Sequence, residues 1–264
     1  MTSPYYWQTF GGVLRSEWVK LRTLRSTWWV VGSTVLVIAG MALASSLSLV
    51  NDPDPVAAAD YFSPTMAVTS GVGFAQLVVI VLGALAITGE YATGMIRSSF
   101  AATPARTPVL VAKVVVVGAL VLTTTALGLA IGWAASWPVL DGAGLRLEAV
   151  GSTWQAMLGV PVYLVLVALT SLGVGALLRH TAGAIFAMVA VVLVLPSVLS
   201  LVDSAWVGAI VDHMPVSAGG AFMAETVLST PGAGPSAWAG FVTMVVWAVV
   251  PLVAAGVVLR RRDA

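Results

Sequence analysis

The side chains of this chain that could do chemistry are few and lie outside its long apolar stretches. The 264 residues include no cysteine, 2 histidines, 11 acidic and 12 basic residues. Without cysteine there is no disulfide, thiolate metal site or cysteine nucleophile. His180 and His213 stand alone in the sequence, whereas a metal site needs several converging donors. We therefore predict neither a catalytic nor a metal site.

Motifs that bind nucleotides or hydrolyse bonds are also missing. The chain has no Gly-x-x-x-x-Gly-Lys-Ser/Thr phosphate loop, no His-Glu-x-x-His and no Gly-x-Ser-x-Gly. We expect that it neither binds ATP by a phosphate loop nor acts as a metalloprotease or serine hydrolase. By itself the chain is predicted to be no enzyme and to hold no cofactor.

The first candidate residues, Glu17, Trp18, Lys20 and Arg22, belong to the segment 5–26. At 100° per residue its apolar side chains share one broad arc, and most of its basic side chains occupy the rest. Glu17 falls on the apolar arc, within i,i+3 reach of Lys20. A basic helix with aromatic residues on its other face lies flat in the headgroup region of a membrane. The segment is therefore predicted to be an interfacial helix, and a plain anchor with no further role is the alternative.

The elements that must position these residues are long and apolar. Residues of the AVILMFWYC class make up 59% of the chain and charged residues 9%, against about 25% charged residues in soluble domains. The mean hydropathy is +1.00. A helix needs about 20 apolar residues to cross the roughly 30 Å hydrocarbon core of a bilayer. We predict an all-α polytopic membrane protein that forms a single domain over residues 1–264, with transmembrane helices at 28–49, 66–88, 114–137, 155–178, 183–202 and 238–259.

The charges between these helices favour one orientation. If the N-terminus is cytoplasmic, all of the 12 basic residues except Arg146 lie on the inner side, and an excess of Lys and Arg in short loops marks that side. We expect a multi-pass protein of a bacterial plasma membrane, with both termini in the cytoplasm. Ala42-Leu43-Ala44 is similar to a signal-peptidase site, but its apolar run is too long and starts too late for a signal peptide.

Two segments between the predicted helices are long enough to carry function. The segment 89–112 is the sizeable inner loop between spans. The outer segment 203–237 contains two short apolar stretches, separated by Pro215 and Gly219-Gly220. These stretches are too short to span, so we predict interfacial or re-entrant helices.

Small residues and prolines within the spans bear on how the helices pack. Gly128 and Gly132 permit close approach of another helix, either inside the monomer or in a dimer. Pro161, Pro196 and Pro251 each interrupt the hydrogen-bond ladder of a span and can kink the helix there, either as a plain packing feature or as a hinge.

Two stretches beside the first two spans share a pattern with a known family. One is Ser16-Glu17-Trp18-Val19-Lys20-Leu21-Arg22-Thr23-Leu24-Arg25-Ser26-Thr27-Trp28-Trp29, and the other is Gly89-Glu90-Tyr91-Ala92-Thr93-Gly94-Met95-Ile96-Arg97, followed by Pro104-Ala105-Arg106. With the six-span layout and the long segment before the last span, they resemble the ABC-2 type permeases of ATP-binding-cassette transporters across essentially the whole chain. Many relatives carry Thr at the place of Met95.

This resemblance implies a function and a set of partners. The chain would be the permease subunit of an exporter of a drug, peptide or lipid-like substrate, and it would pair with a second copy or a paralogue. A separate ATPase subunit would bind ATP and Mg, membrane lipids would surround the permease, and no nucleic acid would take part. The loop 89–112 would carry the coupling helix that docks on the ATPase, with Glu90, Gly94, Arg97, Pro104 and Arg106 as its candidate residues.

Glu90 stands where the second predicted span leaves the hydrocarbon, so partial desolvation of its carboxylate calls for a nearby cation. We expect Arg97, Arg22 or a residue of the ATPase to supply it. Arg97 and Arg106 could instead be plain topology charges. Two other functions remain as alternatives: a membrane-embedded enzyme, and a scaffold or immunity protein that binds a partner in the membrane.

Overall fold

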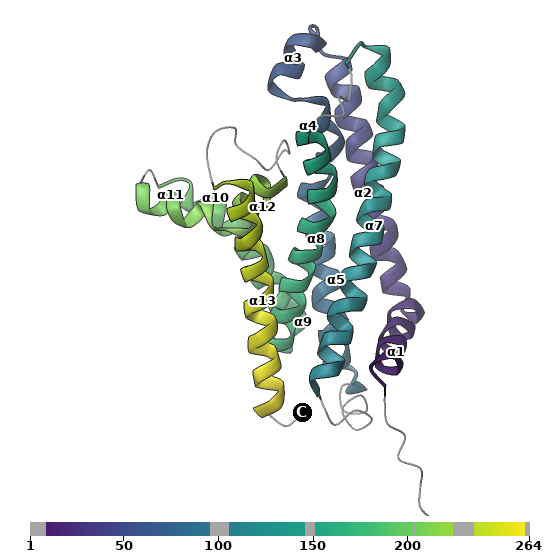
Figure 1. The fold of residues 1–264 in the computed structure, drawn as a ribbon, viewed down its shortest axis with the longest axis vertical. Coiled ribbons are helices and arrows are strands. Elements are labelled where there is room, and N and C mark those ends of the chain that lie inside the picture. The colour runs from purple at the N-terminus through teal and green to yellow at the C-terminus, as the bar shows by residue number, and fades with distance from the viewer. Residues whose placement is uncertain (1–8, 96–105, 146–150, 203, 224–234, 262–264) are drawn as a thin grey trace, which may run out of the picture.

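The structure, a computed structural model, describes residues 9–95, 106–145, 151–202, 204–223 and 235–261. Over these residues it is all-α and contains no strand, which confirms the predicted fold class. Figure 1 shows long helices standing side by side, with α1 and the end of α13 at one end of the bundle and α3 at the other. The elements are α1 (Phe10–Thr23), α2 (Arg25–Val50), α3 (Pro55–Tyr61), α4 (Pro64–Thr69), α5 (Val72–Ala92), α7 (Arg106–Gly142), α8 (Gly151–Leu178), α9 (Thr181–Val189), the π-helix η1 (Ala190–Val194), α10 (Leu195–Leu199), α11 (Ala205–Asp212), α12 (Pro215–Met223) and α13 (Ala237–Arg261).

All six predicted spans are present as helices that are long and apolar enough to cross a membrane. The largest difference concerns the third, because α7 begins at Arg106 and not near residue 114. Its first turns stay helical because Val109 and Ala112 are buried against Val13 of α1. Apart from this extension the bounds agree closely: Arg25–Val50, Pro64–Ala92, Thr107–Gly142, Thr153–Leu178, Thr181–Leu199 and Ala237–Leu259.

The segment predicted as one helix over 5–26 is broken at Leu24. The side chain of Thr9 caps α1 by accepting from the backbone N–H of Gly12 at 3.3 Å. Leu24 has extended backbone angles, φ −78° and ψ 123°, so the chain turns before α2 starts. The indole N–H of Trp28 donates to the carbonyl of Arg22 at 3.0 Å and holds this turn, which we call the elbow (residues 22–28).

Close backbone approach joins α2 to α7. A Cβ on Gly132 would lie 3.0 Å from the Cβ of Ala42, and one on Gly128 would lie 3.2 Å from the Cβ of Ile38. The two glycines therefore pack inside the chain, which favours the first of the two predicted roles for this pair. Larger residues at either position would push α2 and α7 apart.

A second seam joins α5 to α8, and it is both tight and polar. A Cβ on Gly83 would lie 2.2 Å from the carbonyl oxygen of Ala168, so the backbones are in direct contact. Four interhelical hydrogen bonds run along the seam and its extensions into α4 and α9, because hydroxyl and amide groups in hydrocarbon need partners inside the protein. They join Thr65 to Thr153 (3.1 Å), Tyr163 to Gln76 (2.6 Å), Ser171 to the carbonyl of Ile80 (2.6 Å) and Thr181 to Thr88 (2.8 Å).

The fifth span is divided into α9, η1 and α10. The π-helical turn Ala190–Val194 comes just before Pro196, whose missing N–H breaks the regular ladder. At Pro196 the predicted kink is thus a change of helix type, whereas Pro161 and Pro251 lie inside α8 and α13, each of which is one unbroken α-helix.

The segment predicted as re-entrant or interfacial contains the short helices α11 and α12. The indole N–H of Trp247 donates to the carbonyl of His213, between these helices, at 2.9 Å. Trp247 lies about 15 Å along α13 from its start, roughly half the thickness of the hydrocarbon core. After His213, α12 packs along α8, with Gly219 against the ring of Tyr163. The preceding helix, α11, projects away from the bundle (Figure 1). In the described part of this segment, α12 therefore packs against α8 and α13.

Candidate functional site

Most of the acidic residues that the structure describes lie away from the α1 end of the bundle. Asp52, Asp54 and Asp141 lie beyond α2 or at the end of α7, far from α1. At the α1 end, the described acidic side chains are Glu17 and Glu90, and they are only 3% and 5% exposed. Buried carboxylates need compensating charges, so these two residues mark the candidate site.

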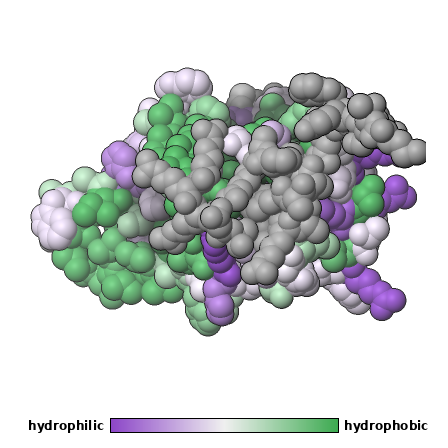
Figure 2. Space-filling view, turned by 90° about the horizontal axis from the view of Figure 1, so that it is seen from below, coloured by the Kyte–Doolittle hydropathy of each residue, from purple (hydrophilic) through white to green (hydrophobic). Residues whose placement is uncertain are grey.

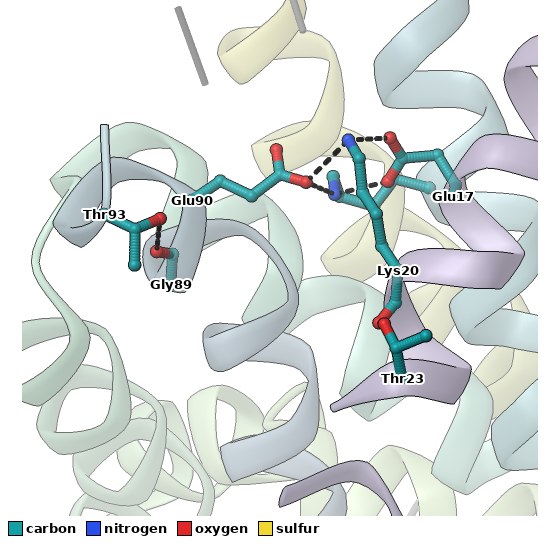
Figure 3. Close-up of polar contacts among 7 residues, drawn as sticks. Glu17, Lys20, Thr23, Gly89, Glu90 and Thr93 are labelled. Atoms are coloured by element: carbon teal, nitrogen blue, oxygen red, sulfur yellow. Dashed lines mark hydrogen bonds and ion pairs between the residues drawn. The ribbon is translucent and has the colours of Figure 1, made fainter. Parts of the chain in front are cut away.

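Glu17 and Glu90 form a four-charge ring with Lys20 and Lys113. The Lys20 ammonium nitrogen lies 2.6 Å from Glu17 Oε1 and 2.9 Å from Glu90 Oε1. The Lys113 ammonium nitrogen lies 2.6 Å from Glu17 Oε2 and 2.9 Å from Glu90 Oε1. In Figure 3, Glu17 and Lys20 come from one helix and Glu90 reaches toward them from another. The ring therefore ties α1 to the last turn of α5 and to the start of α7.

Helix packing explains why these four side chains meet. Val13, Glu17 and Leu21 are the buried residues of α1, and their spacing of four positions puts them on one face. That face packs on the first turns of α7, which carry Lys113. Glu90 is placed by α5, whose end is capped when the hydroxyl of Thr93 donates to the carbonyl of Gly89 (2.9 Å, Figure 3).

The ring is electrically balanced, with two carboxylates and two ammonium groups. Burial alone would lower the pKa of the Lys20 ammonium, but its hydrogen bonds to Glu17 and Glu90 and their negative charges outweigh burial and raise the pKa above its ordinary value of 10.5. Lys20 therefore stays charged at neutral pH. Lys113 is more deeply placed than Lys20, with a side chain only 5% exposed against 22%.

One oxygen of the ring has no partner. Both lysines contact Oε1 of Glu90, whereas Oε2 is buried and makes no hydrogen bond within the described part of the chain. An unsatisfied charged oxygen of this kind is costly. The ring therefore joins the helices through four ion pairs and leaves one carboxylate oxygen, Glu90 Oε2, without a hydrogen bond among the described residues.

A cavity of about 180 Å³ adjoins the ring. Its walls come from α1, the elbow, the start of α2, the last turns of α5 and Lys113 of α7, and most of the lining is apolar. The residues that line it are Glu17, Lys20, Leu21, Leu24, Ser26, Thr27, Val30, Leu82, Leu85, Ala86, Gly89, Glu90, Thr93, Met95 and Lys113.

The structure brings together three of the residues proposed from sequence, namely Glu17, Lys20 and Glu90. The expected i,i+3 contact between Glu17 and Lys20 is present at 2.6 Å. Trp18 and Arg22 are exposed on α1 and are not part of the ring. The expectation that Arg22 neutralises Glu90 was wrong, because the buried face of α1 presents Lys20 to it instead.

The remaining residues belong to the predicted coupling loop. Gly94 follows α5 with a positive φ of 70°, the left-handed conformation that glycine adopts readily after a helix. Arg106 is the first residue of α7 and therefore belongs to a helix. Arg97 and Pro104 lie outside the described residues, and so does the predicted pairing of Glu90 with Arg97.

Lys113 is the site residue that sequence reasoning missed. The sequence assigns it only to the inner side, just before a span predicted to begin at residue 114. Its neighbours Val109 to Ala112 are all apolar, so a helix that begins at Arg106 buries it. A lysine buried in this way requires a carboxylate nearby, and this signal could have led to Glu17 and Glu90.

A basic residue also covers the end of α5 from another side. The guanidinium of Arg179, in the turn between α8 and α9, lies 5.2 Å from the centre of the Tyr91 ring, within range of a cation–π interaction. In the same turn, His180 Nδ1 accepts the backbone N–H of Gly183 at 3.1 Å and so caps α9. His180 thus has a structural role.

Comparison of the chain with models of protein families and with curated proteins finds no match. The functional argument therefore depends on the geometry of the ring and on the residues around it. That geometry is a junction between α1 and the two long spans that contain α5 and α7.

Proposed function

We propose that this chain is the permease subunit of an ATP-binding-cassette exporter and that a separate ATPase subunit binds at its α1 end. The observation that carries the proposal is the four-charge ring formed by Glu17, Lys20, Glu90 and Lys113. The ring lies beside the connection from α5 to α7, the part of the chain that resembles a coupling loop. It joins both ends of that connection to α1.

The ring gives such a loop a mechanical role. A force applied by a partner to residues 93–105 acts on the last turn of α5 and on the first turn of α7. Because Glu90 and Lys113 also contact Glu17 or Lys20 (2.6–2.9 Å), α1 moves with them. The partner would supply ATP hydrolysis with its Mg, a second permease copy or paralogue would complete the pathway, and a drug, peptide or lipid-like molecule would be the substrate.

The proposal places the α1 end of the bundle in the cytoplasm of a bacterial cell. Because the chain has no cysteine, single cysteines can report sidedness without background. A cysteine at Arg106 should be labelled from the inside, and one at Asp54 from the outside, by a reagent that does not cross membranes. Labelling of position 106 from the outside would contradict the proposed orientation.

The energy source is tested with the purified chain and with the ATPase encoded nearest to its gene. Alone, the chain should hydrolyse no ATP. In a co-purified complex in lipid nanodiscs, hydrolysis should be coupled to export, and Glu90→Gln should lower both several-fold at equal membrane levels. Arg15→Gln, an exposed charge change on α1, is the matched control and should leave both unchanged.

Two outcomes would count against this reading in different ways. ATP hydrolysis by a preparation shown to contain no ATPase subunit would overturn the permease assignment. Normal coupling in Glu90→Gln would instead remove the ring from the mechanism, because a mere helix-end carboxylate tolerates glutamine.

A further inference from the structure

The ring has a consequence for the charges around it. At the α1 end, the described acids are Glu17 and Glu90, and both are occupied by Lys20 and Lys113. The arginines of the same region, Arg15, Arg22 and Arg25, are exposed, and no ion pair involves them within the described part of the chain. The positive charges of Lys20 and Lys113 thus balance the negative charges of Glu17 and Glu90. The exposed arginines give this surface a net positive charge.

Exposed aromatic side chains accompany these arginines. Trp18, Trp28 and Trp29 are 44%, 59% and 79% exposed, and tryptophan concentrates at the headgroup level of membranes. In the view from the α1 end, hydrophilic residues stand out on the right, the side on which Figure 1 places α1, and the left flank is hydrophobic (Figure 2). Positive charge and indole rings therefore meet where α1 passes into α2.

The cavity beside the ring opens in the same place. Leu24 and Ser26 both line it, and Arg25 lies between them in the sequence. The cavity volume of about 180 Å³ is similar to the roughly 150 Å³ of an apolar cavity that holds a benzene molecule. It has room for a few methylene groups, and its apolar lining at the elbow suits hydrocarbon.

We infer that the elbow is a binding site for an anionic phospholipid of the leaflet at the α1 end. The phosphate of the lipid lies on Arg22 and Arg25, and part of one acyl chain enters the cavity past Ser26. Charge complementarity selects an anionic headgroup over a zwitterionic one, because Arg22 and Arg25 are exposed, whereas the described carboxylates of this end, Glu17 and Glu90, are buried beside Lys20 and Lys113. The site does not depend on whether the chain is a permease.

The expected selectivity follows from the charges. An arginine near an anionic membrane surface strengthens binding by about fivefold. Replacement of both Arg22 and Arg25 should therefore lower the preference for an anionic lipid by about 25-fold. Raising the ionic strength to 1 M, where the screening length is about 3 Å, should weaken the preference of the unchanged protein as well.

The test uses the full chain in nanodiscs of phosphatidylcholine and phosphatidylglycerol in equal parts, and it counts the lipids that remain bound in native mass spectrometry. The unchanged protein should retain phosphatidylglycerol preferentially, and Arg22→Gln/Arg25→Gln should lose that preference. Ser26→Trp, at an exposed position of the cavity wall, should fill the mouth and reduce retention without a change of charge. Arg179→Gln removes an arginine at a different turn and serves as the control.

The proposal fails if the double arginine variant keeps the preference, or if phosphatidylcholine is retained equally well by the unchanged protein. Retention that is unaffected by Ser26→Trp would overturn the assignment of the cavity to an acyl chain. If the arginine variants bind lipid normally but no longer bind an ATPase subunit, the surface is a protein interface and the lipid site is refuted.

Discussion

The charge balance of the four-residue ring can be tested by removing its members one at a time and then as a pair. Lys113→Met deletes the ammonium that contacts Glu17 at 2.6 Å and Glu90 at 2.9 Å. Two buried carboxylates then share Lys20 alone. Removing one partner of a buried pair costs about 3–5 kcal/mol, so we expect the free energy of unfolding to fall by that amount.

Glu90→Gln acts in the opposite sense, because it leaves two ammonium groups with one carboxylate. The amide oxygen of glutamine can still accept hydrogen bonds, so the expected loss is smaller, about 1.5–3 kcal/mol. The double variant again has one carboxylate and one ammonium, Glu17 and Lys20, in a contact of 2.6 Å. Methionine also fills the place of Lys113 with apolar atoms. We therefore expect the double variant to be more stable than Lys113→Met alone.

The measurement is reversible unfolding by sodium dodecyl sulfate in mixed micelles, followed for the unchanged protein, both single variants and the double variant. Arg22→Gln, an exposed change on the same helix, should lie within about 0.5 kcal/mol of the unchanged protein. The reasoning is refuted if the costs of the two single changes simply add in the double variant, because charge imbalance would then not be their cause.

Three further predictions concern the helix seam and pH. Gly83→Ala should unfold the bundle or shift α5, because its Cβ would lie 2.2 Å from a backbone oxygen of α8, whereas Gly40→Ala has open space around it and should be neutral in the same assay. Tyr163→Phe leaves the side chain of Gln76 without its 2.6 Å hydrogen bond and should cost about 0.6 kcal/mol, the average for such bonds in membranes, and no more than about 1.7 kcal/mol; a larger loss would point to a role beyond this bond. Since the folded-state pKa of Lys20 is raised above 10.5, its contribution to stability should be complete from pH 7 to 9 and should disappear only as the pH rises through the raised value; a loss near pH 8 would contradict this.

The six spans could be predicted because the bilayer leaves few alternatives. Each backbone polar group must be satisfied inside its own helix, so length and apolar composition alone indicate where the spans lie. The start of α7 could not be predicted in this way. Its first turns are stabilised by burial of Val109 and Ala112 against α1, a contact that depends on the tertiary structure.

Of the contacts in the ring, only the one between Glu17 and Lys20 could be predicted from the sequence. Glu17 and Lys20 are three positions apart on one helix, so their contact follows from helical geometry. Lys113 lies 96 positions from Glu17 and 23 from Glu90, and no periodicity connects them. For the same reason the sequence shows Glu17 only as a charge on the apolar arc of its helix, whereas in the structure the Val13, Glu17 and Leu21 part of that arc is buried against protein.

The tight seam between α5 and α8 makes the second span a stiff rod rather than an independent helix. Along this rod, Glu90 at one end and Gln76 are separated by about 21 Å. Gln76 is hydrogen-bonded to Tyr163, whose ring contacts α12 at Gly219. If the four-charge ring is displaced along the axis of α5, the close backbone contact between α5 and α8 opposes slippage of one helix on the other, and we expect α12 to be displaced with them.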